Sequence, residues 1–204
     1  KLAGALAYAW NEHRLLHRDI KPANILLDSA GEPKLVDMGL AKSLADGGDL
    51  TLPGTLLGSP NYMSPEQAEC SGELDARSDI YSLGATLYHA LTTKIPFGGS
   101  SMMDTLRKQA TESLPDPRTF NPALSESCVQ LLESMLAKQP GQRHSDWETL
   151  ISEIDRVLAE QPPVKAPPAA GESVLRRAPM SDPPASSSRA QAGARAAGEQ
   201  AQVV

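Results

Sequence analysis

The sequence has 204 residues, of which 40% are hydrophobic and 22% are charged, an ordinary composition for a globular chain. Its formal net charge of −6 argues against a general nucleic-acid-binding surface, which would be basic. No apolar run approaches the ~18–20 residues of a membrane-spanning helix. Cys70 and Cys128 have no partner at metal-ligand spacing, so we expect free thiols in a reducing compartment. The chain begins at Lys1 inside an apolar pattern, which predicts that it is part of a longer protein.

The first elements along the chain are a helix and a hairpin. Apolar residues recur at helical spacing from Leu2 to Trp10, which predicts a helix that ends before Leu15. Two short apolar runs, residues 25–28 and 34–37, flank turn-forming residues and predict a small β-hairpin.

A loop and a short helix are predicted next. Residues 40–60 are rich in Gly, Ser, Thr and Pro, and such a long loop inside a compact domain usually has a function. Ser64 is followed by a proline at the first helical position and by Gln67 three residues on, so a short helix should start there.

The remaining elements are helices. One apolar helical face runs from Ile80 to Leu91 and another from Val129 to Leu136. Residues 145–148 have the pattern of a capping box with serine as the N-cap. The apolar face of the helix that follows consists of Leu150, Ile151, Ile154 and Leu158.

The composition changes at Gln161. Residues 161–204 are largely Pro, Ala, Ser and Gly with scattered Arg, and contain no aromatic residue. Such a segment cannot bury enough apolar area to offset its ordering entropy. We therefore predict a domain of residues 1–160, mainly α with one small β-hairpin, followed by a disordered Pro/Ala-rich tail or linker.

Four polar residues gather beside the predicted hairpin. Asp19, Lys21 and Asn24 precede its first strand and Asp37 follows its second, so the hairpin brings them to one end. Phosphoryl transfer needs oxygen ligands for Mg²⁺, a cation on the transferred phosphate and a carboxylate that orients a hydroxyl. The four residues supply each part, although any one of them alone could equally cap a turn.

Three motifs resemble the eukaryotic-type protein kinase family. HRDIKPAN at residues 17–24 matches its catalytic loop, DMG at residues 37–39 matches its DFG position, and SPE at residues 64–66 matches its APE position. The resemblance covers residues 1–160, and is greatest to bacterial serine/threonine kinases. It implies the C-terminal lobe of the kinase fold, with an activation segment over residues 37–66.

The resemblance assigns catalytic roles to the polar residues. Asp19 would orient the substrate hydroxyl, and Lys21 would neutralise the γ-phosphate of ATP, as in the serine/threonine branch of the family. Asn24 and Asp37 would hold Mg²⁺ or Mn²⁺. Met38 stands where the family usually has Phe, and would form a more flexible apolar plug.

Regulatory roles are implied for the residues around this centre. Arg18 would pair with a phosphorylated residue of the activation segment, and Thr51 and Thr55 are the best candidates for that modification. Ser59 occupies the position whose hydroxyl contacts the catalytic Asp and Lys, where most relatives have Thr.

The resemblance also implies two structural contacts. Glu66 and Arg143 would form a buried ion pair that ties the activation segment to the later helices. Asp79 would accept hydrogen bonds from the catalytic-loop backbone.

The function implied is that of an ATP-dependent protein serine/threonine kinase. Its partners would be proteins with Ser/Thr acceptors, with phosphorylation of one copy by another as one such reaction, and its domain would be cytoplasmic with a membrane tether beyond the chain end. The sequence contains no Gly-rich phosphate loop, paired strand Lys or hinge, so we expect these 204 residues alone to bind ATP poorly.

Two alternatives remain at this stage. A pseudokinase-like scaffold would need no chemistry, but the intact Asp19, Asn24 and Asp37 argue against it. A small-molecule phosphotransferase shares the H-x-D-x-x-x-x-N loop, but Lys21 and the SPE motif at residues 64–66 argue against that reaction.

Overall fold

The computed structural model describes residues 1–37, 42–43, 59–69, 74–166 and 175–176. The helices are α1 (Leu2–His13), α2 (Pro65–Ala68), α3 (Ala76–Thr92), α4 (Met102–Thr111), α5 (Glu126–Met135) and α6 (Trp147–Leu158). The strands are β1 (Leu15–Leu16), β2 (Ile25–Leu27), β3 (Pro33–Leu35), β4 (Lys42–Ser43), β5 (Leu114–Pro115) and β6 (Leu175–Arg176). Single 3-10 turns are η1 (Pro22–Asn24), η2 (Pro60–Tyr62), η3 (Pro117–Thr119) and η4 (Pro140–Gln142). The mainly helical fold with one small hairpin is confirmed.

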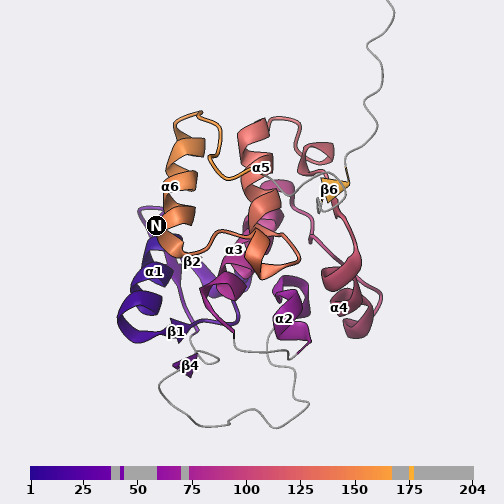
Figure 1. Cartoon of the computed structure of the whole chain (residues 1–204), viewed down its shortest axis with the longest axis horizontal. Helices are drawn as coiled ribbons and strands as arrows, with labels where there is room; N and C mark the ends of the chain where they lie inside the picture. The colour runs from indigo at the N-terminus through magenta and orange to yellow at the C-terminus, as the bar shows by residue number, and fades with distance from the viewer. Residues whose placement is uncertain (38–41, 44–58, 70–73, 167–174, 177–204) are drawn as a thin grey trace, which may run out of the picture.

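Helix α3 lies at the centre of the fold (Figure 1). Two apolar clusters include residues of this helix. The first cluster joins α3 to α1, α5 and α6 through residues such as Leu6, Ile80 and Leu150. The second joins α3 to α5 and β5. Helices α3 and α5 approach closely at Gly84, where an added Cβ would lie 2.8 Å from the Cβ of Met135.

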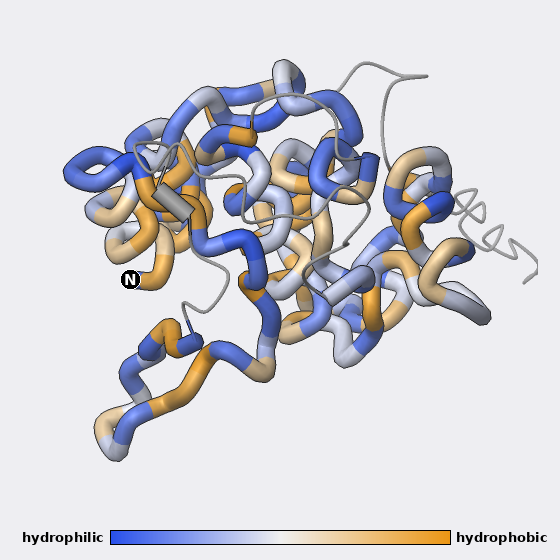
Figure 2. Tube along the Cα trace, turned by 90° about the horizontal axis from the view of Figure 1, so that it is seen from below, coloured by the Kyte–Doolittle hydropathy of each residue, from blue (hydrophilic) through white to orange (hydrophobic). Residues whose placement is uncertain are grey.

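The predicted hairpin is formed by β2 and β3, which pair antiparallel with Ile25 opposite Leu35. It projects from the helical body and carries apolar residues into solvent (Figure 2). Leu26 is 55% exposed and Leu27 is 70% exposed. The hairpin therefore contributes little to the core, and its role is to position the loop that precedes it and the residues that follow it.

Helix α6 begins one residue later than predicted. Its N-cap is Asp146, whose Oδ1 accepts a hydrogen bond of 2.7 Å from the Thr149 backbone N–H, while the Ser145 hydroxyl donates to Asp146. Leu158 is also not on the buried face, because it ends the helix beyond the core and is 77% exposed.

Four short strands, β1, β4, β5 and β6, and one helix, α4, were not expected from the sequence. Within the predicted loop of residues 40–60, β4 pairs antiparallel with β1. Within the tail predicted to be disordered, β6 pairs in parallel with β5. Helix α4 begins at an N-cap, Ser101, whose hydroxyl accepts a hydrogen bond from the Asp104 backbone N–H. Among the described residues, no helix combines the length and apolar character needed to cross a membrane.

Candidate active site

Asp19 lies in the loop between β1 and η1, and its carboxylate is held by hydrogen bonds from three residues. Lys21 Nζ lies 2.6 Å from Oδ2, Asn24 Nδ2 lies 3.2 Å from Oδ2, and the backbone N–H of Ser59 donates to Oδ1 over 3.1 Å. Burial raises the pKa of this carboxyl, but the hydrogen bonds and the charge of Lys21 outweigh burial, so the pKa is lowered overall. Asp19 is therefore ionised near neutral pH.

Ser59 joins the activation segment to the catalytic loop through two different groups. Its hydroxyl accepts a hydrogen bond of 2.8 Å from Lys21 Nζ, as predicted. The backbone N–H of Ser59 donates to Asp19 Oδ1, and a side-chain hydrogen bond from Ser59 also lowers the pKa of that carboxyl. The backbone contact is one that the expectation drawn from the sequence did not include.

The backbone of the catalytic loop is fixed by Asp79 of α3, as predicted. The Asp79 carboxylate accepts hydrogen bonds from the backbone N–H groups of His17, over 2.7 Å, and Arg18, over 2.9 Å. Arg18 has a left-handed φ of 67°, which is uncommon for a residue with a side chain. The Thr86 hydroxyl of the same helix donates to the carbonyl of Ile20. Helix α3 thus sets the path of the loop.

Asn24 and Asp37 lie at the base of the hairpin. Both N–H groups of the Asn24 side chain face Asp19, with Nδ2 lying 2.8 Å from its carbonyl oxygen and 3.2 Å from its carboxylate. The backbone N–H of Val36 donates to the carbonyl of Asn24, so Asp37 follows directly on a contact with that residue. Asp37 is exposed and has a left-handed φ of 62°.

The donor chemistry of Asn24 and Asp37 fits a magnesium ion. An amide oxygen and a carboxylate are hard ligands, and Mg²⁺ is usually bound by one or two protein ligands together with substrate phosphates. In the described part of the chain, no group of three or more His, Cys, Asp or Glu side chains forms a metal site by itself. A site completed by a nucleotide therefore suits these residues better than an all-protein cage.

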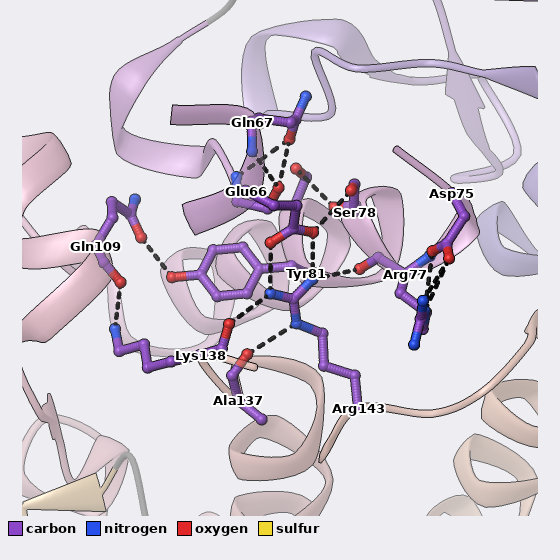
Figure 3. Close-up of polar contacts among 12 residues, drawn as sticks. Glu66, Gln67, Asp75, Arg77, Ser78, Tyr81, Gln109, Ala137, Lys138 and Arg143 are labelled. Carbon is purple, nitrogen blue, oxygen red and sulfur yellow. Dashed lines mark hydrogen bonds and ion pairs between the residues drawn. The ribbon is translucent and has the colours of Figure 1, made fainter. Parts of the chain in front are cut away.

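Glu66 and Arg143 form the predicted ion pair in two parallel hydrogen bonds (Figure 3). Arg143 Nη1 lies 2.6 Å from Oε1 and Nη2 lies 2.8 Å from Oε2 of Glu66. The Arg143 side chain is fully buried, and the Ser78 hydroxyl donates a further bond to Glu66. Burial raises the pKa of Glu66, but Arg143 and Ser78 outweigh it, so the pKa is lowered.

Residues 1–155 of the chain match the protein kinase domain. The chain belongs to the protein kinase family. Together with the mainly helical fold, this match makes the described domain a kinase-like lobe.

Relatives of this kinase lobe include bacterial serine/threonine-protein kinases. It is 42% identical over 133 residues to the DNA damage-responsive kinase RqkA of Deinococcus radiodurans and 36% identical over 154 residues to PrkC of Bacillus subtilis. It is 34% identical over 153 residues to PknB of Mycobacterium leprae. The matches cover 65%, 76% and 75% of this chain, but 20%, 23% and 24% of those proteins. The chain thus spans about a fifth to a quarter of the length of these relatives.

One residue of the kinase lobe that the sequence did not single out is Gln109 of α4. It is completely buried, and its side chain accepts a hydrogen bond from the Tyr81 hydroxyl and donates one of 3.1 Å to the carbonyl of Pro60. Its own carbonyl accepts from Lys138 Nζ over 2.7 Å. Because Pro60 follows Ser59, Gln109 links α4 to the segment that contacts the catalytic loop. The sequence did not predict α4, and so gave no reason to expect that the polar Gln109 would be buried.

Four residues named in the sequence analysis lie outside the described residues. They are Met38, Thr51, Thr55 and Cys70.

Proposed function

We propose that this chain carries the part of a protein serine/threonine kinase active site that handles the γ-phosphate of ATP and the acceptor hydroxyl. The observation that supports this most directly is the ionised Asp19, held by Lys21, Asn24 and the Ser59 backbone. An ionised carboxylate at this position accepts a hydrogen bond from the substrate hydroxyl and so directs its oxygen at the phosphorus atom.

The neighbouring residues have separate proposed roles. The ammonium of Lys21 neutralises charge on the phosphoryl group as it moves, and its bond to the Ser59 hydroxyl keeps it beside Asp19. Asn24 and Asp37 hold Mg²⁺ or Mn²⁺. The metal, when bound, neutralises charge on the phosphate oxygens of ATP.

The same geometry favours a protein acceptor over a small molecule. Ser59 and η2 belong to the segment that α4 holds through Gln109, and we propose that an acceptor peptide binds along this segment beside Asp19. We propose that phosphorylation of Thr51 or Thr55, including by a second copy of the protein, adds a partner for Arg18. Among the described residues, Nε of Arg18 is buried without a hydrogen-bond partner, which supports a role in binding a further group. The free thiol of Cys128 suits action in the reducing cytoplasm.

The test is Asp19→Asn in a protein that joins these residues to a nucleotide-binding lobe. We expect kcat for a Ser/Thr peptide to fall by about 10²–10⁴-fold, because the amide cannot accept a proton as the carboxylate can. Asp104→Asn, on the surface of α4, is the matched control and should leave kcat unchanged. Unchanged transfer in Asp19→Asn, or preferential phosphorylation of an aminoglycoside or choline, would contradict the proposal.

A second measurement concerns the 204-residue polypeptide itself. Its sequence contains no glycine-rich loop and no strand lysine of the family pattern, so we expect little or no transfer from labelled ATP with Mg²⁺. Normal turnover that Asp19→Asn abolishes would overturn this expectation.

A further inference from the structure

A two-residue strand from the Pro/Ala-rich segment lies in the second apolar cluster of the lobe. Strand β6 runs parallel to β5, with Leu175 opposite Leu114 and Arg176 opposite Pro115. The side chain of Leu175 is only 7% exposed. The residues of this cluster that we call the β5 site are Tyr88 of α3, Leu114 of β5, and Val129 and Leu132 of α5.

The position of this strand is unexpected, because the residues that begin the Pro/Ala-rich segment lie against α6, whereas β6 lies beside β5. Residues 161–166 follow α6, and the backbone N–H groups of Val164 and Lys165 donate to the carboxylate of Glu153 on that helix. In Figure 1, α5 lies between α6 and β6. Helix α5 contacts α6, and its residues Val129 and Leu132 share a cluster with Leu175. Helix α6 and strand β6 therefore lie on different sides of α5.

The composition of the segment indicates that this contact is specific. Leu175 is the only leucine in residues 161–204, which contain no isoleucine and no aromatic residue. A segment of this kind cannot form a core of its own. Yet its single leucine is buried among aromatic and aliphatic side chains of the lobe. Main-chain pairing with one strand plus one buried side chain is the mode in which extended peptides add to the edge of a sheet.

We propose that the β5 site is a docking site for an extended, leucine-containing peptide, and that the segment around Leu175 of the same chain is its ligand. Among the described residues, β5 has no strand partner other than β6. Pro115 has no backbone N–H, so the ladder is short and the leucine side chain provides most of the binding. A ligand tethered in the same chain has an effective concentration on the order of millimolar, so a site with a Kd of about 0.1 mM stays roughly nine-tenths filled.

This inference does not depend on phosphoryl transfer, since it concerns only how the segment after α6 is held. If it is correct, whatever follows Arg176 departs beside β5 and not from the end of α6. The site would then determine where on the lobe a C-terminal extension is attached.

Hydrogen exchange on the whole chain tests the contact. The amides of residues 175–176 should exchange at least about ten-fold more slowly than their intrinsic rates, and Leu175→Asp should remove this protection and reduce that around Leu114. Val164→Asp is the matched control, because Val164 lies in the same segment and is 75% exposed, and it should change neither. Exchange of residues 175–176 at intrinsic rates in the unsubstituted chain would overturn the proposal, whether or not Leu175→Asp folds.

A peptide with the sequence of residues 171–180 tests the site in trans. It should bind the Leu175→Asp chain with a Kd on the order of 0.1 mM or below, and the unsubstituted chain at least about ten-fold more weakly, because the site is already filled. The same peptide with aspartate in place of leucine should bind neither. Equal binding to both chains would overturn the proposal. Protection of residues 175–176 that increases with chain concentration would assign the strand to a second copy and overturn the intramolecular contact.

Discussion

Replacing Arg143 with methionine removes the cation that connects the activation segment to the later helices. Arg143 donates two bonds to Glu66, and it also donates to three backbone carbonyls, those of Arg77, Ala137 and Lys138. Methionine fills part of the volume but donates to none of them. The Glu66 carboxylate, which is 14% exposed, would lose the charge that offsets its burial.

The expected cost follows from this loss. Removing one partner of a buried ion pair costs about 3–5 kcal/mol. Domains have free energies of unfolding of about 5–15 kcal/mol, so the loss is a large fraction of the total. For a domain of this size, each kcal/mol shifts Tm by about 2–4 °C, which gives a decrease of roughly 6–20 °C. Glu66→Gln should cost less than Arg143→Met, because it keeps an oxygen acceptor and leaves the three carbonyls bonded.

Urea unfolding followed by circular dichroism measures these differences. Arg107→Met is the matched control, since Arg107 is 63% exposed and pairs with Asp104 at the surface. Its cost should be below about 1 kcal/mol. If Arg143→Met loses less than about 1 kcal/mol, or loses less than Glu66→Gln, then the pair does not carry the stability argued from its burial.

Further substitutions address packing and pH. Gly84→Ala should lower the free energy of unfolding by about 1–3 kcal/mol, because its Cβ would lie 2.8 Å from that of Met135. Gly4→Ala, where nothing lies within 4 Å, should raise the free energy by up to about 1 kcal/mol, and the reverse order in urea would refute this explanation. Burial lowers the pKa of His144 from 6.5 to about 4, so the unfolded chain takes up its proton first as pH falls. Unfolding free energy should therefore fall by up to about 3 kcal/mol between these two pH values, and equal pH dependence in His144→Leu would contradict the assignment.

Helices with a regular apolar face were predictable from the sequence, whereas α4 was not. The buried residues of α4 are Thr105, Leu106 and Gln109, while Met102 and Met103 face solvent. Its burial pattern is therefore carried by polar side chains, which periodicity does not detect. Strand β6 was not predicted for a related reason. A single leucine in a proline-rich segment forms no repeating apolar pattern.

The candidate site was predictable in its residues but not in all of its contacts. The family motifs named Asp19, Asp79 and Arg143, although no local pattern connects residues so far apart. That the backbone N–H of Ser59 also donates to Asp19 depends on the path of the main chain, which the residue type does not specify. At the start of α6, Ser145 and Asp146 are both good N-caps, so the helix boundary was uncertain by one residue.

The carboxylate of Asp79 also bears on the order in which the molecule folds. It receives the backbone N–H of His17, which lies 62 residues earlier in the chain. At about 5–20 residues per second, the catalytic loop leaves the ribosome roughly 3–12 s before its acceptor. Until α3 is made and packed, the left-handed backbone of Arg18 lacks the hydrogen bond that its N–H donates to Asp79. The catalytic loop therefore reaches its final conformation only after this long-range contact forms. A destabilising substitution in α3 would disturb the loop even with every residue of the catalytic-loop motif unchanged.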